Sequence, residues 1–470
     1  MEAPVTKRNP KLRTACDRCY QLKERCERTT TSVHCARCGR LGLDCATVRP
    51  VRPVGRRVQR DISVSGLASG KRRKLEHHQP VIENIEACLD TPEEKELLQF
   101  LLGQVDSMDN YVVCPSFQAE QQHSLAVQLP ASLPLLKDAY LACAITMKQL
   151  QSGNVTDADT NTSIQYISKA MSTLRSLSTS HSKDAALCQT LGSILAFSIY
   201  AAIGVGVPEI CSFCLDTTSS SVEAETAVVN THKGSWENFL ILQETMNCLV
   251  YRQKPTLRIQ TPVPGVVDRH LGLSLPLMPY YHDLCVISNS LAHSTDLSAL
   301  ALLQKQLDDI QSVVKSWQPS NLDQLVGQFD SAEIVHLLAQ AKVYRLGALL
   351  VGHRLRYRLG EQDSQAALWS KEIIMELEIA YQVTKRSIRF VTLPFIVAAV
   401  EVRDKASRSK TLKLVDDCVD QYAPTLKKAT RKFLCNVWRE RDSNFTGYWF
   451  DLVHKPCPVL DSFGRVQFGS

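Results

Sequence analysis

The sequence predicts a small α domain organised by clustered cysteines and a large all-α domain, joined by a disordered basic linker. Three observations support this division. Six of the seventeen cysteines lie between positions 16 and 45, basic residues concentrate near the N-terminus, and apolar residues recur at helical spacing from about residue 130 onward. Helical periodicity with little strand-like alternation indicates an all-α fold. We expect four segments, at residues 1–48, 49–90, 91–114 and 115–470.

The charge of the chain is distributed unevenly. Residues 1–80 contain 19 Lys or Arg against 7 Asp or Glu, whereas the other 390 residues contain 35 against 41. A basic N-terminal segment on a mildly acidic body suggests that the basic part binds a polyanion. No apolar run follows Met1, so the sequence predicts no secretory signal, and reduced thiols are expected.

The cysteine-rich segment is an internal duplication. "CDRCYQLKERC" at positions 16–26 and "CARCGRLGLDC" at positions 35–45 have the same cysteine spacing. A shift of nineteen residues maps every cysteine of the first half onto a cysteine of the second, and it also maps Arg18 onto Arg37. The segment is therefore two copies of one short unit.

The spacing of these cysteines is typical of a metal site. A gap of two residues allows both thiolates of one turn to reach a single ion. Three thiolates do not complete a tetrahedron, so six cysteines supply two ions only if two sulfurs bridge. The segment is also too poor in apolar residues to fold around a core of its own, so metal must stabilise it. Fingers with paired histidines, RING and LIM sites and iron–sulfur clusters fit the spacing less well. We predict two zinc ions, with the ligands Cys16, Cys19, Cys26, Cys35, Cys38 and Cys45.

Residues 15–45, from "ACDRC" to "DC", resemble the fungal six-cysteine binuclear zinc-cluster transcription factors. The resemblance implies that Cys16 and Cys35 bridge the two zinc ions. It also implies a nuclear protein that binds double-stranded DNA at CGG-type triplets and regulates RNA polymerase II genes. Regulators of this kind often control metabolic or secondary-metabolite gene clusters.

The two copies differ just before their last cysteine. The first copy has Lys23, Glu24 and Arg25 there, where the second has Gly42, Leu43 and Asp44. We therefore expect the first helix to enter the major groove and the second to support it. The resemblance implies that Lys23 reads the base edges of a CGG triplet, and a lysine suits guanine, which presents two acceptors in that groove. Phosphate contacts, which position a domain without reading sequence, are predicted for Arg18, Arg25, Arg13 and Lys11.

The segment after the cysteines reads as a linker followed by a short helix. Pro and Gly interrupt residues 49–90, and "KRRK" reads as a nuclear import signal or as a further patch that binds the DNA backbone; its residues are Lys71, Arg72, Arg73 and Lys74. Thr91, Pro92 and Glu94 then form a helix start with a capping box. Because leucines share one face of this helix, we expect residues 91–114 to be an amphipathic segment that could contribute to a homodimer.

The long C-terminal part is expected to be one helical body with loops near 152–160, 216–234, 252–268 and 318–328. Residues 185–208 contain no charge, and we interpret them as a buried core helix rather than a membrane span. "DRHLGLSLPLMPYYHDLCVIS" and "RFVTLPFIVAAVEVRD" resemble the fungal-specific transcription-factor domain. That resemblance implies a regulatory domain that dimerises, contacts the transcription machinery and responds to effectors.

The body contains no set of residues that is typical of an enzyme active site, so we expect that the protein is not an enzyme. A Gly-rich phosphate loop with Lys is missing, and the pair Cys211 and Cys214 has no second pair nearby in sequence. His282 and Asp283 fit packing or capping better than catalysis. Two alternatives remain open at this point: a zinc module that only scaffolds proteins, and an enzyme in the body with a DNA-binding appendage.

Overall fold

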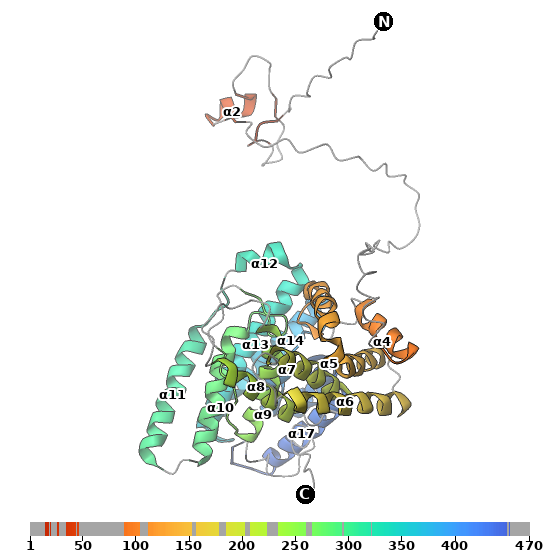
Figure 1. The fold of residues 1–470 in the computed structure, drawn as a ribbon. Helices are drawn as coiled ribbons and strands as arrows, with labels where there is room; N and C mark the ends of the chain where they lie inside the picture. The colour runs from red at the N-terminus through yellow and green to blue at the C-terminus, as the bar shows by residue number, and fades with distance from the viewer. Residues whose placement is uncertain are drawn as a thin grey trace. The chain divides into compact units, whose positions relative to one another are not determined.

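The computed structural model describes residues 15–17, 19, 26–27, 34–43, 45–46, 89–103, 111–152, 157–177, 185–202, 207–222, 234–259, 266–293, 296–320, 322–448 and 451. The chain divides into two compact units, residues 1–74 and 75–470 (Figure 1). Within the described residues the regular structure is helical, and the only β pairing is an isolated bridge between Asp268 and Gly272. This confirms an all-α body.

The first unit contains the short helix α2 (Ala36–Arg40). Cys35 caps its N-terminus, because the Cys35 sulfur accepts a hydrogen bond from the Cys38 N–H. The helix ends at Leu41, and Gly42 follows with a φ of 61°. Glycine adopts this left-handed conformation at little cost, so it suits the turn that brings the chain back toward Cys45.

The second unit consists of helices that pack on one another around a single core (Figure 1). They are α4 (Pro92–Gly103), η2 (Pro115–Phe117), α5 (Gln118–Ser152), α6 (Asp157–Leu177), α7 (Ala185–Ala202), α8 (Val207–Val222), α9 (Gly234–Tyr251), η4 (Leu275–Leu277), α10 (Met278–His293), α11 (Leu297–Ser316), α12 (Leu322–Gln328), α13 (Ser331–Arg356), α14 (Asp363–Thr384), α15 (Thr392–Val400), α16 (Lys405–Cys418) and α17 (Pro424–Asp442).

The predicted loops agree with the structure only in part. Residues 252–259 are irregular, as expected, but α6 starts at Asp157, α8 continues to Val222 and α12 occupies most of the predicted loop at 318–328. Helix α12 is only seven residues long and buries one side chain, Leu325, while Val326 is 76% exposed. One buried position in two turns gives no periodicity, so the sequence pattern could not reveal this helix.

Helix α4 begins where its capping signal predicted. The Thr91 hydroxyl accepts from the Glu94 N–H at 3.3 Å, and the Glu94 carboxylate accepts from the Asp90 N–H at 2.8 Å. Leu98 and Leu101 are buried in the core of the same chain, where α4 packs on α5. A dimer contact through this segment stays a prediction, and it would have to use the other faces of the helix.

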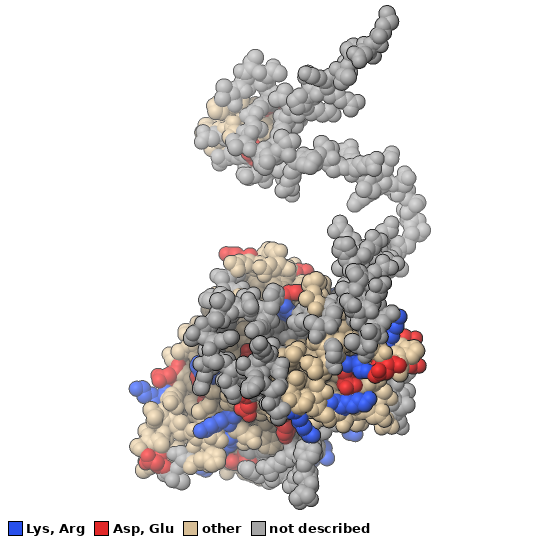
Figure 2. Space-filling view, in the orientation of Figure 1, with Lys and Arg blue, Asp and Glu red and all other residues tan. Residues whose placement is uncertain are grey.

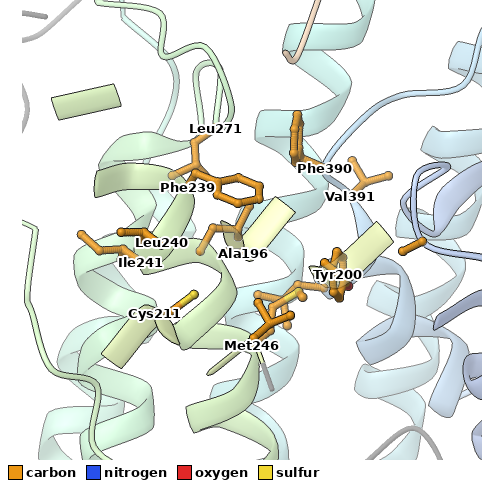
Figure 3. Packing of buried hydrophobic residues seen from close by; sticks show 14 of the residues in the cluster. Ala196, Tyr200, Cys211, Phe239, Leu240, Ile241, Met246, Leu271, Phe390 and Val391 are labelled. Atoms are coloured by element: carbon orange, nitrogen blue, oxygen red, sulfur yellow. The ribbon is translucent and has the colours of Figure 1, made fainter. Parts of the chain in front are cut away.

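The charge-free stretch forms α7, and every residue from Leu191 to Tyr200 is buried. This confirms a core helix. Figure 3 shows Ala196 and Tyr200 of α7 together with Phe239 of α9 and Phe390 in the interior. By length and composition one described helix, α13, could cross a membrane, but 72% of its apolar window is buried inside the protein.

Helix α13 is largely buried and packs closely against α10, α11, α14 and α15. Gly347 lies so near α10 that a Cβ at this position would come within 2.6 Å of the Tyr281 hydroxyl. That hydroxyl donates to the Tyr344 carbonyl at 2.8 Å. Glycine is therefore needed here for helix packing rather than for backbone conformation.

The C-terminal end of α13 buries an arginine. The Arg354 guanidinium, 1% exposed, donates from Nε and Nη2 to the two carboxylate oxygens of Glu401 at 2.8 and 2.7 Å. Its Nη2 also donates to Asp363 at 2.6 Å, and its Nη1 donates to the carbonyls of Arg358 and Glu361 at 2.9 and 3.1 Å. All five N–H groups of the guanidinium are thus used.

Candidate metal centre

The six cysteines of the N-terminal unit lie in two overlapping groups. One contains Cys16, Cys19, Cys26 and Cys35, and the other contains Cys16, Cys35, Cys38 and Cys45. Within each group every sulfur lies within 4.8 Å of the others. Cys16 and Cys35 belong to both groups, so the structure places these two sulfurs between the other four.

The sulfur spacing fits a tetrahedral metal site. The Cys16 sulfur lies 3.9 Å from that of Cys35 and 3.8 Å from that of Cys38, and the sulfurs of Cys19 and Cys35 are 3.8 Å apart. A zinc–sulfur distance of about 2.3 Å places the corners of a regular tetrahedron about 3.8 Å apart. The same spacing is far above the roughly 2.05 Å of a disulfide bond, so these side chains are thiols.

Backbone hydrogen bonds relate the two copies by an approximate twofold axis. The Asp17 N–H donates to the Ala46 carbonyl at 2.9 Å, and the equivalent Ala36 N–H donates back to the Glu27 carbonyl at 3.0 Å. Residues 17 and 36, like residues 27 and 46, are equivalent positions of the duplication. Each copy therefore donates one backbone hydrogen bond to the other and accepts the equivalent one from it.

Each copy also repeats the same contacts around its own sulfurs. The Cys16 N–H points to the Cys26 sulfur at 3.3 Å, and the Cys35 N–H points to the Cys45 sulfur at 3.2 Å. In the same way, the Cys19 N–H donates to Cys16 at 3.5 Å and the Cys38 N–H donates to Cys35 at 3.4 Å.

These amide donors favour deprotonation of the two shared sulfurs. The Cys19 N–H lowers the pKa of Cys16 below its usual value, and the Cys38 N–H lowers the pKa of Cys35 to about 6. In contrast, burial raises the pKa of Cys19, and the hydrogen bond with Cys35 raises the pKa of Cys38. A thiolate is the form of cysteine that binds metal, so Cys16 and Cys35 are deprotonated, and can bind metal, more readily than Cys19 and Cys38.

Among the described residues of this unit, the buried side chains that form a cluster are cysteines. Cys16, Cys19, Cys35 and Cys38 are buried, and among the described residues only Leu43, Cys26 and Cys45 pack on them. Burying several thiols without an apolar core gives little stability. The clustered cysteines can hold a metal ion, and a soft, all-sulfur donor set is compatible with zinc.

The predicted DNA contacts lie outside the described residues, as does the predicted import signal. This applies to Lys23, Arg18, Arg25, Arg13 and Lys11, and to Lys71, Arg72, Arg73 and Lys74. In the second copy, Leu43 is half-buried against the cysteines, whereas Leu41 is 50% exposed. Arg40 at the end of α2 is exposed.

The helical body offers fewer candidates for chemistry. Cys211 and Cys214 in α8 are both fully buried, and burial raises the pKa of Cys211 well above its usual value, which favours the unreactive thiol. Asp283 is engaged by Arg258 through two hydrogen bonds of 2.9 and 3.0 Å. On the face drawn in Figure 2, the described Lys and Arg residues of the body are interspersed with Asp and Glu.

Sequence reasoning missed one feature of the body. A hollow lined by His336, Lys385, Arg386 and Arg389 lies where the segment between α14 and α15 meets the start of α13. The signal that could have indicated it is "KRSIRF" at positions 385–390, which has three cations in six residues between two apolar helices.

Comparison with known proteins gives one match. A family model described as the fungal specific transcription factor domain matches residues 136–459, which lie within the helical body. No curated protein and no solved structure matches the chain.

Proposed function

Because the chain belongs to the family defined by the fungal specific transcription factor domain, it is a transcription regulator, and we propose that it binds DNA sequence-specifically and controls RNA polymerase II genes in the nucleus. The observation that carries this proposal is the combination of the family match with the duplicated cysteine cluster. The two features lie in separate compact units of one chain. A regulator built in this way recognises DNA with one part and receives regulatory input with the other.

The metal in this proposal is a pair of zinc ions. Cys19 and Cys26 would complete one site and Cys38 and Cys45 the other, with Cys16 and Cys35 shared between them. The spacing of the sulfurs and the amide donors on the two shared positions support this assignment. Zinc would supply structural cross-links here, because a zinc site closed by sulfur ligands has no open position for a substrate.

DNA recognition is assigned to the first copy of the duplication. Lys23 would read the guanines of a CGG triplet, since a lysine can donate to the O6 and N7 acceptors of guanine. Arg18, Arg25, Arg13 and Lys11 would contact phosphates. The strongly basic composition of residues 1–80 supports this division, and the import signal at 71–74 would bring the protein to the nucleus.

The helical body is assigned to regulation, through a homodimer contact, the transcription machinery or an effector. We assign it no catalytic step, since its Cys211–Cys214 pair is buried and Asp283 is paired with Arg258. The nature of the regulated genes, for instance a metabolic or secondary-metabolite cluster, would follow from the DNA motif.

The test is selection of duplexes from a random pool by the full-length protein at physiological salt. We expect enrichment of CGG triplets, whose spacing also reports a monomer or a dimer. Lys23→Ala should weaken target binding by about 1–3 kcal/mol and relax specificity. Arg40→Ala, in the exposed end of α2, is the matched control and should leave specificity unchanged.

Binding that follows salt concentration but enriches no sequence would contradict the proposal. A basic zinc module that only scaffolds other proteins would then be the better account. Zinc content gives a second, independent reading. Cys35→Ser should lower the metal bound per chain more than Cys45→Ser, because Cys35 belongs to both sulfur groups and Cys45 to one.

A further inference from the structure

The hollow beside the start of α13 has the size of a ligand site. Its volume is about 590 Å³, and its lining includes Glu333 and His336 of α13, Arg386 and Arg389 of the following α14–α15 segment, and Asp417 of α16. Pockets for small molecules usually measure roughly 300–1,000 Å³. The lining is mainly polar, so any ligand must bring polar groups of its own.

The segment that supplies the cations is held in a fixed conformation. Lys385 and Phe390 have left-handed φ values of 56° and 54°, which are costly for residues with a side chain. The Lys385 N–H donates to the Tyr381 carbonyl at 2.7 Å, and the Phe390 carbonyl accepts from the Tyr344 hydroxyl at 2.7 Å. The Phe390 ring is buried in the core seen in Figure 3.

Further hydrogen bonds fix the middle of the segment. The Arg389 carbonyl accepts from Gln340 at 3.2 Å, and the Ser387 hydroxyl donates to Asp417 at 3.2 Å. Thr384, at the end of α14, bonds to His336 at 2.7 Å and accepts from the Arg386 N–H at 3.2 Å. A preorganised loop loses little conformational freedom when a ligand binds, which favours affinity.

The electrostatic balance of the hollow favours an anion, because three cations, Lys385, Arg386 and Arg389, line it against two carboxylates, Glu333 and Asp417. The carboxylate of Glu333 is already satisfied by Ser116, which donates its N–H and its hydroxyl at 2.6 Å each, and by the Asp330 N–H at 2.9 Å. In contrast, Lys385 and Arg386 are exposed, and neither forms an ion pair with a described residue. Burial lowers the pKa of His336, so its ring is neutral near pH 7.

An apolar hollow adjoins this one. It measures about 380 Å³ and lies between α14 and α16; its apolar lining includes Leu377, Ile388 and Leu414, and the ion-paired Lys410 and Glu378 also line it. The two hollows share Tyr381, Ser387 and Asp417 as lining residues. A cationic end and an apolar end are thus continuous along the surface of the body.

We propose that these adjoining hollows bind a small organic anion. Its carboxylate or phosphate group would lie against Lys385, Arg386 and Arg389, and its apolar part would lie toward Leu377, Ile388 and Leu414. This site goes beyond the proposed DNA-binding function and does not depend on it, because every residue that forms it belongs to the helical body.

The test uses the full-length protein and three probes that share a phenyl group. Phenylacetate and phenyl phosphate carry the anion, and phenylacetamide is the neutral isostere of phenylacetate. Isothermal titration should show saturable binding of at least one anion and weaker binding of the amide. The stronger of the two anions distinguishes a carboxylate site from a phosphate site.

Two substitutions locate the binding. Arg386→Glu, and separately Lys385→Glu, should weaken anion binding by about tenfold to a hundredfold, the loss expected for a hydrogen bond to a charged group. Lys432→Glu is the matched control, because it makes the same charge change at an exposed position of α17 away from the hollow. An unchanged thermal unfolding midpoint checks that each variant folds.

Three outcomes would overturn the proposal. They are equal binding of phenylacetate and its amide, equal loss in the Lys432→Glu control, and no saturable binding of either anion. DNA binding is not measured in any of these titrations, so failure here leaves the proposed function untouched, and failure of DNA selection leaves this site untouched.

Discussion

Replacing Arg354 tests how much the buried ion pair at the end of α13 contributes to the body. In Arg354→Met the Glu401 carboxylate, whose side chain is 2% exposed, loses both hydrogen bonds from the guanidinium. Its remaining cationic partner is Arg441, with 3.4 Å between Nη1 and Oε2. A buried carboxylate without adequate pairing cannot regain hydration, so the folded state carries its full desolvation penalty.

The expected loss in the free energy of unfolding is about 3–5 kcal/mol, the range for removal of one partner from a buried pair. Arg354→Lys keeps the charge, but an ammonium has three donors where the guanidinium has five, so it should recover only part of the loss. Removing both charges in Arg354→Met/Glu401→Leu should restore much of the stability.

The assay is urea unfolding of the full-length protein followed by tryptophan fluorescence. Trp438 is a suitable local probe, because its Nε1 donates to the Ala399 carbonyl at 3.0 Å beside the ion pair. Arg258→Met is the control: Arg258 also binds a carboxylate through two hydrogen bonds, but its side chain is 49% exposed, so a loss below about 1 kcal/mol is expected. If Arg354→Met and Arg258→Met cost the same, burial does not govern the strength of the pair and the reasoning is refuted.

Three further predictions concern the packing at Gly347, the buried carboxyl group of Asp420 and the metal. Gly347→Ala should destabilise the body by about 1–3 kcal/mol, because the new Cβ would clash with the Tyr281 hydroxyl; an unfolding midpoint equal to that of the wild type would argue against this close packing. Burial raises the pKa of Asp420 to about 6, so the folded state binds more protons than the unfolded state between about pH 4 and 6, and stability should fall as pH rises through that window by an amount on the order of 3 kcal/mol. Urea unfolding as a function of pH should show that this fall is missing in Asp420→Asn. A chelator should abolish specific DNA binding by the full-length protein without moving the main thermal transition, because residues 75–470 have their own core; a shifted main transition would mean that metal also stabilises the body.

Features set by local spacing could be predicted from the sequence. The cysteine cluster is one, because two residues between thiols place both on one turn wherever the segment lies. The start of α4 is another, since Thr91 and Glu94 act on amides within a few residues of themselves. The burial of α7 followed from the absence of charge over 24 residues.

Features that depend on tertiary contacts could not be predicted in this way. In the sequence Arg354 is one of several basic residues at positions 353–358, and nothing local indicates its partner Glu401, which is 47 residues away. The hollow proposed to bind an anion is lined by residues of α13, the α14–α15 segment and α16. No local sequence pattern predicts that these three segments lie next to one another. Phe390 has a left-handed φ, which is unfavourable for a residue with a large side chain. Local conformational preference therefore does not predict this backbone conformation.

The reciprocal bonds between the two cysteine-containing copies have a consequence for how this unit assembles. The Asp17 N–H reaches Ala46 and the Ala36 N–H reaches Glu27, so each half is completed by the other in the manner of two subunits across an isologous interface. The unit therefore resembles a symmetric dimer whose two subunits are joined in one chain. The effective concentration of one half near the other is set by the short connection between them, and not by the amount of protein in the cell. Because each half makes these contacts only with the other, we expect a truncation between Glu27 and His34 to remove both proposed metal sites together.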